Sequence, residues 1–554
     1  DTSGTYGSVN LDGAYTQNGD PSAKIEAVFN LAVSDRFALR GVAFSDTQGG
    51  YIDQVAGTLD VSDSARFRSA GTVRDNGVAV SSARDGIQTG ADVSGVTFID
   101  AEANVKSNVN ETTYQGGRLS GLLDISDDWQ VSASVMQQSI ESDGVFFADP
   151  ELGGMQIQRY ADDKIEDEFT NSSWTIEGRV GALEVLYTGA YTDRDTDQTV
   201  DYTDYLFVGQ YLPYYICDGS VSYPGENAPS GTCQSPMMFV NSASNTEVWS
   251  HEFRVSTPAE NALSFTGGVF LSGLELTELN DFTYPGSTIA APYGGFAPNY
   301  AFNTGGHITD TGRFPDGVIF RNDIKRTDDQ QGVFGEATYR FSDTFALTAG
   351  LRWYDIEVDL EGSANSSFCN AGQTADENAY GTNISDLYDG DGVFTYVSTC
   401  TDANRITYTL DDLGSEGVSA QIAGALTAPD TAQTDGTIGK LSLSFTPNDD
   451  TLIYLTWSEG FRPGLLNRPG GATSAGNPAY SVPFVLKTDT VDNYELGWKV
   501  DLMDRAMRFN GSLFRVEVED LQTTIFDPSI VNLFFSDNAA DARITGLEGD
   551  LLWN

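Results

Sequence analysis

Basic residues are scarce in this sequence, and their scarcity limits the partners that it can bind. The 554 residues include 30 lysines and arginines against 80 aspartates and glutamates, which gives a formal net charge of −50. Proteins that bind nucleic acid neutralise its phosphates with clustered lysines and arginines, so we exclude nucleic acid as a partner.

Histidine is rarer still, and the common catalytic motifs are missing. With only two histidines, His251 and His307, the sequence shows no catalytic triad. It also lacks the Gly-Lys-Ser or Gly-Lys-Thr motif of phosphate-cradling loops. We therefore predict neither enzymatic activity nor a cofactor.

No run of apolar residues approaches the roughly 20 that a membrane-spanning helix needs. A helical membrane protein is therefore excluded, although a membrane barrel is not, because barrels distribute their apolar residues in alternation. Hydrophobic residues make up 40% of the chain, so disorder is not expected either.

The four cysteines form two local pairs in polar segments. Cys217 and Cys233 lie in one segment, and Cys369 and Cys400 lie in another. Without a Cys-x-x-Cys motif and with so few histidines, a zinc site is not expected. We predict two loop disulfides in an oxidising compartment. The nearby carboxylates of Asp386–Gly392 do not match the spacing of a calcium loop, so we interpret them as a solvated loop and predict no metal site.

Alternation of apolar and polar residues is the dominant pattern that the sequence does contain. Between Val333 and Trp353, small or apolar residues alternate with polar ones on both sides of a break at Ser342–Thr344. This pattern predicts two strands joined by a tight turn. The same rhythm recurs along the chain and predicts about sixteen strands, the last near Ile544–Trp553.

The predicted connections are unequal in length, which indicates how the strands assemble. Short turns alternate with long polar connections, which cover residues 47–103, 142–169, 197–244, 277–327, 360–434, 460–487 and 520–540. Aromatic residues stand beside the short turns, namely Phe37, Trp129, Phe341, Phe345 and Phe445. Both features are typical of an all-β, transmembrane antiparallel β-barrel with long extracellular loops, one strand face meeting lipid and the other a lumen. Sixteen strands make a porin-sized barrel, whereas about 22 strands need a plug.

Several segments resemble the barrel domain of TonB-dependent outer-membrane receptors. They follow the family's order along the chain, and they are SHEFRVSTP (Ser250–Pro258), FGEATYRFSDTFALTAGLRW (Phe334–Trp353), WSEGFRPGLLNRP (Trp457–Pro469), NYELGWKVDLMDRAMRFNGSLFRVEVEDLQ (Asn493–Gln522) and ARITGLEGDLLW (Ala542–Trp553). The resemblance implies a 22-strand barrel preceded by a plug domain of roughly 120–150 residues, which is an ordinary domain size. Because neither the plug nor the final strands are visible, we expect residues 1–554 to be an incomplete barrel domain of such a receptor.

Charged residues at alternate positions of three predicted strands are candidates for the lumen wall. They are Glu252, Arg254, Glu336, Arg340, Glu495 and Lys499. The resemblance implies that some wall carboxylates pair with arginines of the plug and latch it. The alternative is that these residues are an ordinary polar wall. An unpaired charge in a confined lumen is costly, so pairing of some kind is expected.

Tyrosines in a long loop are candidates for ligand contact. Tyr211, Tyr214 and Tyr215 lie within Tyr205–Gly219. Tyrosine holds ligands by stacking and by hydrogen bonds from its hydroxyl group. These residues could equally pack their loop around the predicted disulfide of Cys217 and Cys233.

The resemblance implies energised uptake across the outer membrane of a Gram-negative bacterium. The expected partners are outer-membrane lipid, a TonB-type energy-coupling complex of the inner membrane, and a small-molecule or oligosaccharide ligand. For the family, that ligand is an iron–siderophore complex, cobalamin, haem or an oligosaccharide. Two alternatives remain open at this point: a passive porin-like channel, and a surface interaction protein whose loops dock a partner such as a lipoprotein.

Overall fold

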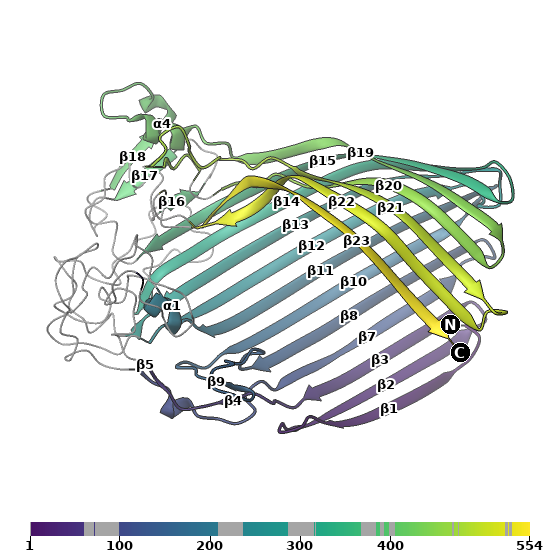
Figure 1. Ribbon diagram of the computed structural model, residues 1–554, viewed down its shortest axis with the longest axis horizontal. Coiled ribbons are helices and arrows are strands. Elements are labelled where there is room, and N and C mark those ends of the chain that lie inside the picture. The colour runs from purple at the N-terminus through teal and green to yellow at the C-terminus, as the bar shows by residue number, and fades with distance from the viewer. Residues whose placement is uncertain are drawn as a thin grey trace.

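One large antiparallel sheet makes up most of the structure (Figure 1). The computed structural model describes residues 2–59, 71, 99–208, 237–285, 315, 317–366, 384–387, 393–397, 405–467, 470–474, 476–526, 530 and 534–553. The sheet has 17 strands within these ranges, one of which, β16 (Ile384–Leu387), has four residues. The other sixteen are β1 (Tyr6–Tyr15), β2 (Pro21–Ser34), β3 (Phe37–Gln48), β7 (Thr112–Asp124), β8 (Trp129–Asp143), β10 (Lys164–Val180), β11 (Leu183–Asp201), β12 (Phe239–Ser256), β13 (Leu263–Thr283), β14 (Val318–Arg340), β15 (Phe345–Ser366), β19 (Thr431–Asn448), β20 (Thr451–Arg462), β21 (Asp489–Leu502), β22 (Met507–Ile525) and β23 (Phe535–Trp553). The prediction of about sixteen strands is confirmed.

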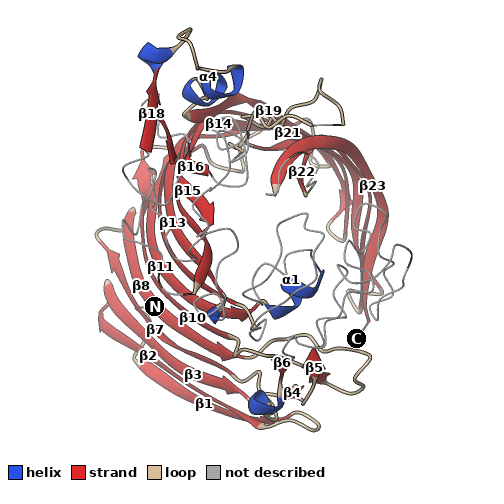
Figure 2. Cartoon of the chain, turned by 90° about the vertical axis from the view of Figure 1, so that its left-hand side faces the viewer, coloured by secondary structure: helices blue, strands red, loops and turns tan. Residues whose placement is uncertain are grey.

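Each long strand pairs with the next one along the chain, always antiparallel. The sheet bends into a curved wall around a central space (Figure 2). In the described part of the chain, β1 pairs with β2 alone and β23 pairs with β22 alone, so these two strands are the edges of the wall.

The two faces of the wall differ in the way that the alternation predicts. Along β2, exposed side chains alternate with half-buried ones, and Phe29 on the outward face is 52% exposed. Large apolar side chains are exposed at outward positions throughout the sheet, including Leu119, Val135, Leu271, Leu351, Leu455 and Leu513. A soluble protein rarely exposes so extended an apolar surface, which indicates an apolar environment around the wall.

Small hydroxyl side chains pair across strands on the inward face. Ser120 donates to Ser134 over 3.2 Å, and Thr338 and Thr348 share a hydrogen bond of 2.8 Å. Equivalent pairs join β10 to β11 and β19 to β20. The inward face is therefore polar, and the buried apolar clusters lie at the long-connection end, for example around Tyr354, Ile356 and Leu466.

Arginines near one short turn often bind the neighbouring turn. Arg36 lies 2.8 Å from Asp127, and Arg505 lies 2.9 Å from Asp450. These contacts join successive hairpins into one rim, and both chain termini lie at this short-turn end (Figure 1).

The opposite end carries the long connections and their short elements. These are β4 (Asp53–Gln54), β5 (Thr58–Leu59), β6 (Ile99–Asp100), η4 (Glu102–Asn104), β9 (Gln156–Ile157), α1 (Thr203–Val208), β17 (Val393–Val397), β18 (Arg405–Thr409), η8 (Leu410–Asp412) and α4 (Ala420–Leu426). Among the described residues, none of the helices has the length and apolar character needed to cross a membrane.

Candidate functional site

The structure places the six predicted wall residues on the inward face. Glu252 and Arg254 lie on β12, where the flanking Phe253 is exposed on the outward face. Glu336 and Arg340 lie on β14, and Glu495 and Lys499 lie on β21, again between exposed outward residues. Contact with a plug remains a prediction for all six.

Each of the three carboxylates has a partner within the wall. Lys440 Nζ on β19 lies 3.1 Å from Glu336 Oε2, and Arg254 forms an ion pair with Glu252 on the same strand. The hydroxyl group of Tyr454 donates to Glu495 over 2.6 Å. The wall therefore pairs two of these carboxylates with cations and gives the third a hydrogen-bond donor.

These wall contacts are partly solvated, which limits their contribution to stability. The side chains of Lys440 and Glu336 are 48% and 43% exposed. An ion pair with that exposure contributes about 0–1 kcal/mol, so a second partner can compete for either charge.

The side chain of Arg340 forms hydrogen bonds to the backbone of a neighbouring turn. Its Nη1 donates to the carbonyl oxygens of Ala259, over 2.5 Å, and Asn261, over 3.0 Å. Both acceptors belong to the turn between β12 and β13, so Arg340 stabilises the short-turn rim. The side chain of Lys499 on β21 has no hydrogen bond or ion pair within the described ranges.

A buried ion-pair cluster fixes the connection between β8 and β10 at the long-connection end. Arg159 is 8% exposed and donates to both carboxylate oxygens of Asp163, over 2.7 and 2.6 Å. It also donates to the carbonyl oxygen of Asp201, over 3.0 Å, at the end of β11. Burial opposes the charge of Arg159, but the hydrogen bonds and the charge of Asp163 outweigh that effect and raise the pKa of the guanidinium.

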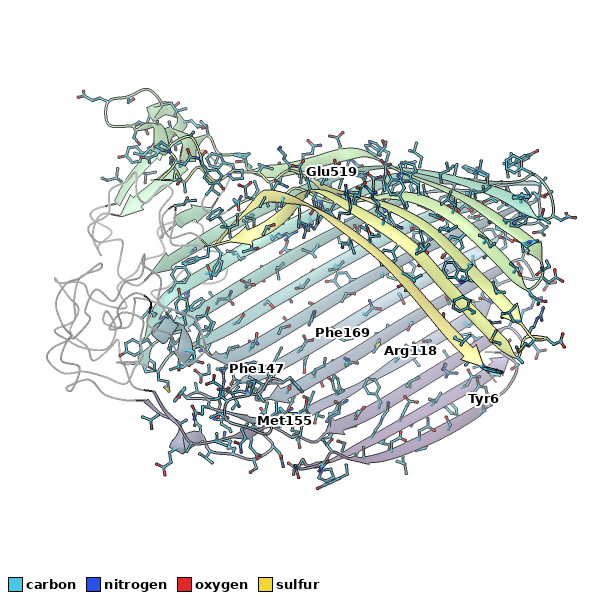
Figure 3. All side chains as sticks on the ribbon, in the orientation of Figure 1. Tyr6, Arg118, Phe147, Met155, Phe169 and Glu519 are labelled. Atoms are coloured by element: carbon cyan, nitrogen blue, oxygen red, sulfur yellow. The ribbon has the colours of Figure 1, made fainter. Side chains whose placement is uncertain are left out.

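The carboxylate of Asp201 extends this cluster to α1. It accepts hydrogen bonds from the amides of Tyr160, over 2.5 Å, and Thr203, over 2.9 Å. On the other side, the guanidinium of Arg159 lies 5.9 Å from the ring centre of Phe147, which is on the exposed part of the connection together with Met155 (Figure 3). The cluster therefore ties a long connection to the strand end from which α1 begins.

Aromatic rings gather at the mouth of the curved wall, beside α1. The rings of Tyr202 and Tyr205 lie 5.0 Å apart, and Tyr202 meets Phe282 edge-on at 5.4 Å. Phe282 in turn meets Phe320 at 5.6 Å. α1 lies inside the ring of strands in the view along the wall (Figure 2). Burial raises the pKa of the Tyr202 hydroxyl, so the group stays protonated and can donate a hydrogen bond.

Sequence reasoning named other tyrosines of the same segment. Tyr211, Tyr214 and Tyr215 lie outside the described residues, as do all four cysteines and most of Asp386–Gly392. The aromatic run from Tyr202 to Phe207 was the available signal for the cluster around α1. Within the ranges that the structure describes, no three carboxylate, histidine or cysteine side chains gather as a metal ion would require.

The comparisons with known proteins agree with this architecture. A sequence model of the family described as TonB dependent receptor-like, beta-barrel, matches residues 142–554, while a search of curated protein sequences finds no match. Among solved structures, the ferric yersiniabactin uptake receptor FyuA from Yersinia pestis is 11% identical with a TM-score of 0.55, and the alignment covers 99% of this chain and 58% of FyuA. The siderophore receptor PiuA from Acinetobacter baumannii is 12% identical with a TM-score of 0.52, and the alignment covers 99% of this chain and 61% of PiuA. The ferric citrate transporter FecA, in its unliganded form, is 11% identical with a TM-score of 0.52, and the alignment covers 98% of this chain and 55% of FecA.

At these identities the solved structures establish the fold alone, and the chain spans between 55% and 61% of their lengths. The family match covers well over half of the chain, and it includes every strand from β10 to β23. This chain therefore belongs to the TonB-dependent receptor β-barrel family, whose members are outer-membrane proteins of Gram-negative bacteria.

Proposed function

We propose that this chain is the barrel of a receptor that takes up a scarce solute with energy delivered through TonB. The observation that carries the proposal is the division of the wall into an exposed apolar outward face and an inward face of paired hydroxyl groups and ion pairs. Such a wall suits a polar interior inside a membrane. Family membership supplies the energy source and the inner-membrane partner.

A plug and closing strands belong to the same proposal. The outer backbone groups of β1 and β23 lack strand partners in the described part of the chain. Inside a bilayer, unsatisfied backbone groups cost several kcal/mol each, so a barrel wall must close. In the receptor, we infer that further strands pair with these edges and that a plug fills the lumen.

The ligand is inferred to be a small metal-binding molecule of the siderophore kind that contacts the mouth of the barrel. FyuA is a ferric yersiniabactin uptake receptor, and PiuA is a siderophore receptor. In this chain, the cluster of Tyr202, Tyr205 and Phe282 offers aromatic faces and hydroxyl groups there. Cobalamin, haem and oligosaccharides are the other classes to include in a screen.

Uptake by intact cells tests the proposal, with a ferric siderophore mixture enriched in radioactive iron as the probe. Accumulation that requires the gene and stops when an uncoupler collapses the proton gradient is the expected result. Gene-dependent entry that continues in the presence of the uncoupler would indicate a passive channel instead. The intact mass of the protein from purified outer membranes, compared with 59.7 kDa for these 554 residues, tests for the plug and closing strands.

A further inference from the structure

The outward face of the wall has a sharp boundary near the long-connection end. On five strands an outward aromatic residue is followed, at the next outward position toward that end, by a carboxylate. The pairs are Tyr191 and Asp193 on β11, Trp249 and Glu247 on β12, Trp353 and Asp355 on β15, Trp457 and Glu459 on β20, and Tyr494 and Asp492 on β21. The aromatic groups bind the carboxylates across strands: Tyr191 donates to Glu247, and Trp457 donates to Asp492, each over 2.8 Å.

This boundary marks the depth at which the outer leaflet ends. Trp and Tyr prefer the interface, with their rings on the hydrocarbon side and their polar ends on the headgroup side. The carboxylates therefore lie among the headgroups. One outward position on the other side of the aromatic residues lies about 5 Å deeper, for strands tilted by about 45°.

His251 occupies that deeper position on β12, surrounded by aromatic rings. The imidazole stacks on Tyr187 with an interplanar angle of 12°, and Nδ1 lies 3.1 Å from the Tyr187 hydroxyl oxygen. The ring centres of Trp249 and Trp174 lie 5.6 and 6.0 Å from the imidazole. These four side chains form the His251 cluster, which spans β10, β11 and β12.

Two glycines make room for the indole rings of the cluster. A Cβ atom on Gly189 would lie 2.7 Å from the ring of Trp174, and one on Gly273 would lie 2.5 Å from Trp249 Nε1. Both indoles therefore lie across neighbouring strands and frame the imidazole. This close packing fixes the position of His251 on a lipid-facing surface.

The hydrogen bond to Nδ1 leaves Nε2 as the remaining polar atom of the imidazole. When the Tyr187 hydroxyl donates to Nδ1, the ring hydrogen is on Nε2, and no side chain or backbone group in the described ranges accepts it. A polar N–H in an apolar layer is stabilised by any available acceptor.

We propose that the His251 cluster binds the acyl ester of an outer-leaflet lipid, with Nε2–H of His251 donating to an ester carbonyl oxygen. Ester carbonyls lie just below the headgroups, which is the depth that the aromatic and carboxylate pairs define. Phe253, the next outward residue of β12 toward the membrane centre, is 44% exposed, and Leu271, directly opposite His251 on β13, is 45% exposed. They provide the apolar surface along which the acyl chain continues.

Lipid retention by the purified full-length receptor in native mass spectrometry tests this site. The probes are a diacyl phosphatidylcholine and its dialkyl ether analogue, which has the same headgroup and no ester carbonyl. The wild type is expected to retain the ester lipid several-fold more than the ether lipid. His251→Phe keeps an aromatic ring and removes the donor, so it should abolish that preference, and Tyr187→Phe should weaken it.

Leu455→Phe is the matched control, because Leu455 lies one outward position deeper than Trp457 on β20, as His251 does relative to Trp249. This variant should keep the preference for the ester lipid. Equal retention of the two lipids by the wild type, or a preference that survives His251→Phe, would overturn the proposal. Lipid A in place of phosphatidylcholine identifies which ester-bearing lipid of the outer leaflet binds more tightly. Heat-dependent gel mobility verifies that each variant is folded.

Discussion

At the scale of single residues, the loss of the Arg159 side chain should strongly destabilise the connection between β8 and β10. Arg159→Met leaves the carboxylates of Asp163 and Asp201 buried without their cation. Breaking a buried pair in this way costs roughly 3–5 kcal/mol. We expect the connection between β8 and β10 to open locally, and limited proteolysis within residues 144–163 should become much faster.

The same connection offers a matched control in an exposed ion pair. Lys106 and Asp162 lie 2.8 Å apart, with side chains that are 53% and 65% exposed. Lys106→Met should change the proteolysis rate little, since exposed pairs contribute about 0–1 kcal/mol. Equal rates for the Arg159 and Lys106 variants would contradict the role of the buried cluster.

At the scale of the strands, close contacts between indole rings and glycines join β10 to β11 and β12 to β13. Gly273→Ala places a Cβ atom 2.5 Å from Trp249 Nε1, so the indole must move from its position. Overpacking of this kind typically costs about 1–3 kcal/mol. The variant should lower the temperature at which the purified barrel unfolds, as measured by heat-dependent gel mobility.

Gly41→Ala on β3 separates this effect from the general effect of replacing a strand glycine. A Cβ atom on Gly41 meets nothing within 4 Å, and Gly41 is also on the outward face of an inner strand. This variant should unfold at or slightly above the wild-type temperature, because alanine restricts the unfolded chain more than glycine does. A similar loss in both variants would show that the contact with Trp249 is unimportant.

The sequence predicted the strands correctly where one face meets lipid, but it underestimated their length beyond the lipid layer. Alternation placed the hairpin of Val333–Trp353 correctly, but β13 runs on to Thr283 and β14 begins at Val318, inside the connection predicted for residues 277–327. Outside the membrane both faces of a strand meet water, so polar residues occupy both faces, as the consecutive residues Lys325 and Arg326 do on β14. The alternation that identifies a strand is then lost.

The partners of the wall residues could not be predicted for a different reason. Glu336 and Lys440 are 104 residues apart, and they meet because β14, β15 and β19 are neighbours in a particular register. A shift of one residue in that register would turn one side chain outward. Periodicity gives the face of a residue but not its register, so it identified the carboxylate and missed the lysine.

At the scale of the whole molecule, the pair of Glu336 and Lys440 bears on how the barrel holds its plug. Glu336→Lys in the full-length receptor places two ammonium groups side by side and would repel a plug arginine. We expect a several-fold rise in the passive conductance of planar bilayers that contain the receptor.

The double variant Glu336→Lys/Lys440→Glu restores a pair within the wall but displaces its carboxylate from β14 to β19. If Glu336 binds the plug, the double variant should still leak, whereas tight closure would show that the pair serves the wall alone. Unchanged conductance in the single variant would exclude Glu336 from the latch.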